Sequence, residues 1–225
     1  MTFFKKLMDE TASQREEFQS IALIQHTVQH GVTPELYASY LEQAYRHVRY
    51  TVPLLEQARD TCLAQGDESY IEALNEYIEE ETGHDEWILE DISALGFDSE
   101  SVRNGQGGFA CRIMIGYAYY AIERISPYAL LGMVHVLEGM SVVLADKAAG
   151  SIAKSFGDTP PDAFSYLTSH GALDIEHVQF FEDLVNGIKT PEIERIIISA
   201  AKDFYTLFGN IFRELGTNRL SPTTP

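Results

Sequence analysis

The spacing of apolar residues along this chain allows helices and leaves little room for a sheet. From residue 13 to about residue 213, apolar side chains recur at intervals of three and four, the period of one face of an α-helix. No stretch of four to eight residues shows convincing strand alternation between turn signals. The pattern therefore predicts an all-α fold.

Turn and capping residues divide this pattern into seven predicted helices. The segments are 13–30, 33–62, 67–95, 109–125, 126–156, a segment between residues 161 and 187, and 190–213. Residues 98–108 form the clearest predicted loop. The fourth segment is apolar and aromatic enough to suggest a helix that is buried on most of its faces.

Two residues inside these helices predict local distortion. Pro53 lies within the second segment and is expected to kink it, because proline lacks the backbone N–H that a helix interior needs. Gly83 lies within the third segment, where glycine costs about 1 kcal/mol relative to alanine. We interpret Gly83 as a site where another group approaches the backbone closely.

Length and composition favour one domain that acts on small molecules. The 225 residues include no Pro/Gly/Ser-rich linker, so we expect a single domain over residues 1–225. Lys and Arg total 16 against 34 Asp and Glu, and the net charge of −18 disfavours binding to nucleic acid or to an anionic membrane surface. The N-terminus has no secretory apolar region, and no apolar run approaches the roughly 20 residues that span a bilayer. We therefore expect a cytoplasmic protein whose two cysteines are reduced.

The segment His170-Gly-Ala-Leu-Asp-Ile-Glu-His177 carries the strongest chemical signal. At about 100° per residue in a helix, Asp174 lies about 40° from His170, and His177 returns to within about 20° of it. Imidazole and carboxylate groups on one line suit a transition-metal ion better than an apolar core. A hydrated helix face is the alternative, but Phe180 and Phe181 make the following turns apolar. We interpret the motif as metal-binding.

Two other helices supply further carboxylates. Glu81 and His84 form a Glu-x-x-His pair, the spacing by which helical di-iron proteins present both groups to one ion. The pair is a weak signal in so acidic a chain, and Glu80 offers a second register. Glu138 lies within an apolar helix, where a carboxylate must be paired, bind a cation or have a raised pKa. The alternative for Glu138 is a bond to a buried group such as Arg112.

The number of ligands favours two metal ions over one. Three imidazoles and three carboxylates exceed the two-His-one-carboxylate set of a mononuclear non-heme iron site, and the set lacks the thiolates of structural zinc. Two ions that share a carboxylate fit better, and no catalytic residue beyond the ligands is predicted. The six predicted ligands are Glu81, His84, Glu138, His170, Asp174 and His177.

These residues resemble the heme-oxygenase-like di-iron oxidases and oxygenases, which share the seven-helix fold of heme oxygenase and the TenA proteins. The family pattern is a Glu and a nearby His on one core helix, one Glu on a later helix, and His-x3-Asp-x2-His on another. The six residues match this pattern, and the resemblance covers nearly the whole chain. It implies a single-domain heme-oxygenase-like bundle with two Fe(II) ions. Such an enzyme uses O2 as co-substrate to oxidise a small organic substrate, amino-acid-like or a carboxylic acid.

Other members of the same fold define the alternatives. A TenA or thiaminase-like hydrolase needs a nucleophilic cysteine, for which Cys111 is the candidate, although no adjacent base is recognisable. A heme oxygenase needs a proximal histidine such as His26 or His30, but the six-ligand set would then have no explanation. A non-catalytic ligand-binding protein would keep the pocket and tolerate the loss of metal.

Substrate-binding residues and assembly are less sharply predicted. Arg112 or Arg49 would anchor a substrate carboxylate if either side chain faces the cavity. His47 is interpreted more simply as a buried core histidine than as a group that supports a metal ligand. Because relatives with this fold are often dimers, the resemblance also admits a homodimer.

Overall fold

The chain is built from helices alone over the part that the structure describes. A computed structural model describes residues 1–63, 67–156 and 161–220. Within the helices, a few side chains lie outside this description, chiefly those of residues 144–150 and 168–176. The described residues form twelve α-helices, two short 3-10 helices and no strand, which confirms the predicted all-α class.

The helices follow one another with short connections. Their bounds are α1 Phe3–Glu10, α2 Ala12–Gln19, α3 Ala22–His30, α4 Pro34–Val48, α5 Thr51–Leu63, α6 Glu68–Glu81, α7 His84–Ala94, α8 Ser99–Asn104, α9 Phe109–Arg124, η1 Pro127–Ala129, α10 Leu130–Phe156, η2 Pro161–Phe164, α11 Ser165–Gly187 and α12 Pro191–Leu220. The described part has more helices than the seven predicted, chiefly because three predicted segments are each broken into two. The broken pairs are α2 and α3, α4 and α5, and α6 and α7.

Two of these breaks have a clear backbone cause. Pro53 falls in the first turn of α5, where backbone N–H groups have no partner within the helix, so the predicted kink is a complete break. Gly83 separates α6 from α7 with a φ of 93°, in the left-handed region. A Cβ added at Gly83 would meet nothing within 4 Å, so the predicted close approach is wrong. Glycine serves the turn instead, because it adopts positive φ without strain.

Two short helices and one helix end differ from the prediction. The predicted loop at residues 98–108 contains α8, whose N-terminus is capped by Asp98, the acceptor of a hydrogen bond from the Ser101 backbone N–H at 3.0 Å. α1 precedes the first predicted segment and buries Phe3 and Leu7. α12 continues to Leu220, beyond the predicted end near residue 213.

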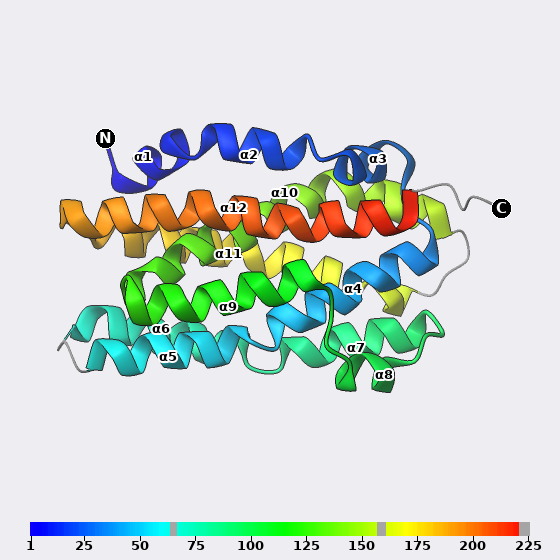
Figure 1. The fold of residues 1–225 in the computed structure, drawn as a ribbon, viewed down its shortest axis with the longest axis horizontal. Helices are drawn as coiled ribbons and strands as arrows, with labels where there is room; N and C mark the ends of the chain where they lie inside the picture. Colours follow the sequence, from blue (N-terminus) through cyan, green and yellow to red (C-terminus); the bar gives the residue numbers. More distant parts are fainter. Residues whose placement is uncertain (64–66, 157–160, 221–225) are drawn as a thin grey trace.

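The long helices α10, α11 and α12 form the middle of the bundle, with α5, α6 and α9 along one side (Figure 1). α10 packs against both α11 and α12, and α5 packs against α6. Aromatic rings join α2 to α12, where Phe18 stacks on Phe208 at 5.3 Å and meets Phe212 edge-on at 5.4 Å. Although α10 and α12 have 27 and 30 residues, no helix of the described part is apolar enough over sufficient length to cross a membrane.

A buried carboxylate ties α7 to the beginning of α11. Asp91 of α7 accepts hydrogen bonds from the backbone N–H groups of Ser165 and Tyr166, both at 2.9 Å, and from the Ser165 hydroxyl. Burial raises the pKa of Asp91, and these hydrogen bonds offset part of the rise. Because α7 begins at His84 and α11 contains His177, this connection fixes two helices that carry predicted ligands.

Candidate metal centre

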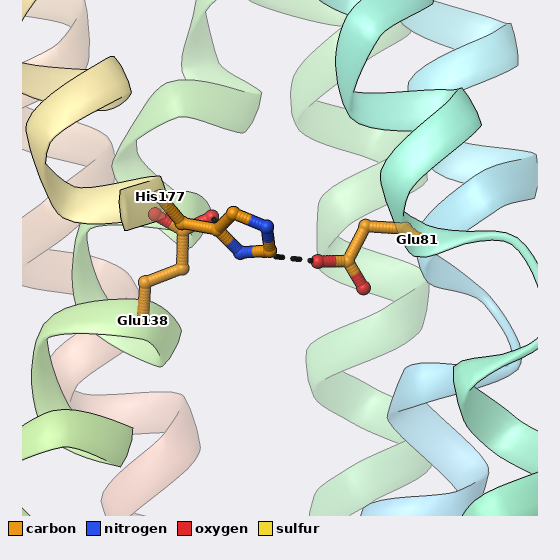
Figure 2. Close-up of side chains that lie close together, drawn as sticks. All are labelled: Glu81, Glu138 and His177. Atoms are coloured by element: carbon orange, nitrogen blue, oxygen red, sulfur yellow. Dashed lines mark ion pairs between the residues drawn. The ribbon is translucent and has the colours of Figure 1, made fainter. Parts of the chain in front are cut away.

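Four helices bring four of the six predicted ligands together. Glu81 is the last residue of α6, and His84 is the first residue of α7. Glu138 lies on α10 and His177 on α11. Figure 2 shows the His177 ring directed at the Glu81 carboxylate, with Glu138 beside the ring.

Glu81 lies between two imidazole rings. Its Oε2 is 3.2 Å from Nδ1 of His84, and its Oε1 is 3.6 Å from Nδ1 of His177. The same His177 nitrogen is 3.9 Å from Oε1 of Glu138. Ligand atoms of Glu81, Glu138 and His177 all lie within 4.8 Å of one another. Each carboxylate thus has an imidazole nitrogen as a near neighbour.

The cluster is shielded from solvent. The side chains of His84 and His177 are 7% and 5% exposed, and those of Glu81 and Glu138 are 9% and 12% exposed. Carboxylates in such surroundings are costly unless a cation or a charged partner compensates them. The Glu138 carboxylate lies 3.9 Å from His177 and away from solvent, so it faces the cluster, as the metal interpretation requires. Arg112 is not its partner, because Arg112 is exposed and donates to the Gly107 carbonyl and the Gln106 side chain.

Glu81 and His84 lie close together as predicted, but the local structure that brings them together differs from the predicted one. The sequence spacing places both on one face of a continuous helix, whereas the structure places them on either side of the Gly83 turn. The turn directs His84 back towards Glu81, and the indole of Trp87 stacks on the His84 ring at 4.4 Å. This stacking restricts the orientation of the His84 imidazole by packing alone, because the indole carries no charge.

Two predicted ligands lie outside the described residues. His170 and Asp174 belong to α11, but their side chains are not described. Their role as ligands stays a prediction.

Glu80 and Tyr77 also face the cluster. The sequence offers Glu80 only as an alternative to Glu81 beside His84, and it gives Tyr77 no role at the site. Oε2 of Glu80 is 3.3 Å from Nε2 of His177, so Glu80 meets the second ring nitrogen while Glu81 faces the first. Tyr77 lies one turn before Glu81, and its ring is 6.5 Å from the ring of His177. Burial, followed by the charge of Glu138, raises the pKa of Tyr77 well above its ordinary value. Tyr77 precedes Glu81 by four residues, which places both on one face of α6. This spacing is the sequence signal that could have identified Tyr77 as a neighbour of the cluster.

A largely apolar pocket opens onto the two carboxylates. It encloses about 910 Å³ including its open mouth, and Glu81 and Glu138 form part of its wall. Most of the other lining groups are aliphatic or aromatic, as in pockets that bind small organic molecules. They are Tyr40, His47, Val48, Thr51, Leu54, Leu55, Leu130, Met133, Val134, Leu137, Ser141, Tyr166, Leu167 and Phe208. His47 packs edge-on against Phe208 at 5.7 Å, so it is both a buried core residue and part of this wall.

The two arginines proposed as substrate anchors point elsewhere. The Arg49 guanidinium lies over the rings of Tyr45 and Tyr50, and it donates to the Arg103 carbonyl. Neither Arg49 nor Arg112 is among the described residues that line the pocket, so the predicted arginine anchor is not supported.

The residues that the alternative activities require are poorly placed for chemistry. Cys111 is fully buried, its Sγ donates to the Gln43 carbonyl at 3.6 Å, and burial raises the pKa of the thiol to about 12. A thiol in this environment is a weak nucleophile. His26 and His30 are exposed on α3, which gives a heme no enclosed proximal ligand there.

The described donor set suits iron. Carboxylate oxygen together with imidazole nitrogen, without thiolate, is the combination that non-heme iron proteins use. The carboxylates lie on α6 and α10, the imidazoles on α7 and α11, and all four side chains point into the bundle. A cation among them would compensate the buried negative charge of Glu81 and Glu138.

Comparison with known families and structures identifies a family for this chain and a fold that it shares with solved structures. A family model described as iron-containing redox enzyme matches residues 38–209, a range that includes all six predicted ligands. A domain of unknown function with a heme oxygenase-like fold from Shewanella denitrificans superposes with a TM-score of 0.86 at 20% identity, covering 96% of this chain and 93% of that chain. Comparison with curated proteins finds none that matches.

Two further solved structures share the architecture. A TenA homolog from Pseudomonas syringae pv. tomato has a TM-score of 0.79 at 12% identity and covers 96% of this chain and 93% of that chain. A CADD-like protein of unknown function from Nostoc punctiforme has a TM-score of 0.74 at 18% identity, with 99% and 96% covered. At these identities the likeness concerns the fold, and it confirms the predicted heme-oxygenase-like bundle.

Proposed function

The chain belongs to the iron-containing redox enzyme family, and on that premise we propose that it is a non-heme di-iron enzyme that uses O2 to oxidise a small organic substrate, amino-acid-like or a carboxylic acid. The observation that carries the proposal is the buried cluster of Glu81, Glu138 and His177, whose ligand atoms lie within 4.8 Å of one another. A cluster of this composition, enclosed by helices, is how di-iron bundle proteins hold their ions.

The ligands of two Fe(II) ions in this proposal are Glu81, His84, Glu138, His170, Asp174 and His177. Ferrous ions bound by them would supply the electrons that reduce O2. Glu80 supports one ligand: as acceptor for the Nε2–H of His177 at 3.3 Å, it favours the tautomer whose Nδ1 lone pair points at Glu81 and Glu138. Glu80 thereby orients a ligand and fixes where its ring proton is held.

The pocket supports the substrate part of the proposal. Its apolar walls would exclude water from the carboxylate end, which protects a reactive oxidant from side reactions. Tyr40, Thr51 and Tyr166 give the described wall a few hydrogen-bonding groups that could orient a bound molecule. A volume of about 910 Å³ including the mouth suits a small organic molecule rather than a polymer.

Reaction with O2 tests this function directly. The protein is purified without oxygen, loaded with Fe(II) and mixed rapidly with O2 while visible absorption and O2 consumption are followed. We expect a transient absorption band that is absent from His177→Ala and Glu138→Ala. His135→Gln is the matched control, because His135 lies on α10 near Glu138 but contacts Thr11, with 3.4 Å between Nε2 and Oγ1. Iron-loaded protein that consumes no O2, or variants that react like the wild type, would refute the proposal.

A further inference from the structure

A second cavity lies next to the pocket that opens onto Glu81 and Glu138. This distal cavity encloses about 600 Å³ including its open side, at the end of the bundle where α3 packs against α10 and α12 (Figure 1). Eight of its twelve described lining residues are aliphatic and none carries a charge. The hydroxyls of Thr27, Tyr37 and Tyr40 are the only polar side-chain groups among these twelve. Such a lining disfavours charged and strongly polar molecules.

Two antiparallel helices place the distal cavity and the pocket along one line. On α4, Leu36 lines the distal cavity and Val48 lines the pocket, about 18 Å further along the helix. On α10 the order is reversed, since Glu138 lines the pocket and Ile152, about 21 Å further along, lines the distal cavity. Both helices therefore describe the same sequence of spaces, from the distal cavity through the pocket to the carboxylates.

The partition between the two spaces consists of side chains. Tyr40 and Leu167 line both of them, and both residues are half-buried. The Tyr40 ring packs at 5.8 Å from the ring of Phe212, which lines the distal cavity. Phe212 in turn meets Phe208 of the pocket edge-on at 5.2 Å. A partition of this kind opens by rotamer changes and without breaking a helix, so it can pass a very small molecule.

We propose that the distal cavity holds dioxygen and supplies it to the candidate metal centre past Tyr40 and Leu167, an inference that rests on the proposed O2-dependent function. O2 is uncharged and apolar, so it gains by leaving water for an apolar space. A polar organic substrate belongs instead in the pocket, whose wall includes His47 and Ser141 as well as the two carboxylates. With substrate in the pocket, O2 from the distal cavity reaches the centre from another side and does not have to displace it.

Xenon binding tests the distal cavity in protein that contains no iron. Xenon is an apolar probe, and crystals under xenon pressure are expected to show it beside Leu36 and Ile152. Leu36→Trp fills this space from a position outside the pocket wall, and it is expected to abolish the xenon site. Leu63→Trp, the same substitution at an exposed position of α5, is the matched control and should retain it. Val28→Phe is a second, smaller filling substitution in case Leu36→Trp does not fold.

O2 consumption by iron-loaded protein tests the delivery. The rate is measured at several O2 concentrations, together with the iron retained per chain. We expect Leu36→Trp to lower the second-order rate constant at least about threefold, because it removes the space from which O2 is supplied. Its iron content is expected to equal that of the wild type, since Leu36 is not a candidate ligand, and Leu63→Trp should match the wild type in both respects.

The outcomes separate this inference from the proposed function. Wild-type protein that consumes O2 no faster than the filled variants, or crystals with no xenon in the distal cavity, would overturn the inference and leave the proposed function standing. An alkyl-chain molecule that co-purifies and occupies both spaces would also overturn it, because the distal cavity would then belong to the substrate. Iron-loaded wild type that consumes no O2 would refute the proposed function and this inference together.

Discussion

Among single residues, Glu81 organises the candidate centre. Its two oxygens face different imidazoles, those of His84 and His177, and these come from different helices. Glu138 completes the group from a third direction and lies within 3.9 Å of the same His177 nitrogen. The cluster therefore depends on the mutual placement of helices that are far apart in sequence.

His135 makes a testable contribution to the pH dependence of stability. Burial, assisted by the charge of Arg15, lowers its pKa from 6.5 to about 4. Between these two values the unfolded chain binds a proton that the folded chain does not, so stability falls as the pH falls from about 6.5 to 4. The loss attributable to His135 is about 3 kcal/mol at the low end of this window. Urea unfolding at several pH values should show that His135→Gln reduces the acid destabilisation.

The control for this prediction is His26→Gln, which removes an exposed imidazole from α3. If His135→Gln and the control lose stability in parallel as the pH falls to 4, His135 is not the group responsible. Substitution of a buried, hydrogen-bonded side chain also costs stability at neutral pH, so the comparison rests on the change with pH and not on the absolute values.

At the scale of helices, the turn between α6 and α7 decides the geometry of the Glu81 and His84 pair. Gly83 adopts a φ of 93°, which residues with a side chain rarely adopt. A longer, unbroken helix would carry His84 away from its observed position, because the turn changes the direction of the chain. The cost of a glycine in this segment is thus offset by the turn that it permits.

Gly83→Ala tests the importance of this turn. We expect the substitution to lower the free energy of unfolding by about 1–2 kcal/mol, because alanine in the left-handed region is strained even without a clash. Gly139→Ala is the matched control: Gly139 lies within α10, and an added Cβ also meets nothing within 4 Å. Alanine there is expected to be neutral or to stabilise by up to about 1 kcal/mol. Equal effects of the two substitutions, measured by chemical unfolding, would contradict the role assigned to the turn.

The limits of sequence reasoning are clearest at this scale. The apolar period was sufficient to predict the helical class, and the apolar neighbours of Glu138 correctly indicated a carboxylate shielded from solvent. Gly83 was misinterpreted because glycine serves both close approach and positive φ, and sequence alone does not distinguish them. The contact between Glu80 and His177 could not be predicted, since it depends on the relative rotation of α6 and α11.

Considered as a whole, the molecule combines a buried acidic cluster with an apolar pocket that leads to it. The four candidate ligands whose side chains are described lie on four helices, and Asp91 connects two of these helices at the beginning of α11. Ions that bind the folded chain and not the unfolded chain would therefore stabilise the bundle as well as equip it for chemistry. The prediction that α9 is buried on most of its faces is wrong for one face, on which Phe109, Ile113 and Tyr120 are exposed.

Anaerobic titration with Fe(II), followed by removal of free iron and measurement of iron per chain, tests the central claim most directly. The wild-type protein and His135→Gln are expected to retain about two iron ions per chain and to gain thermal stability on loading. His177→Ala and Glu138→Ala are each expected to retain markedly less iron, because each removes a donor from the buried cluster. Wild-type protein that retains no iron, or all four proteins retaining the same amount, would contradict the account.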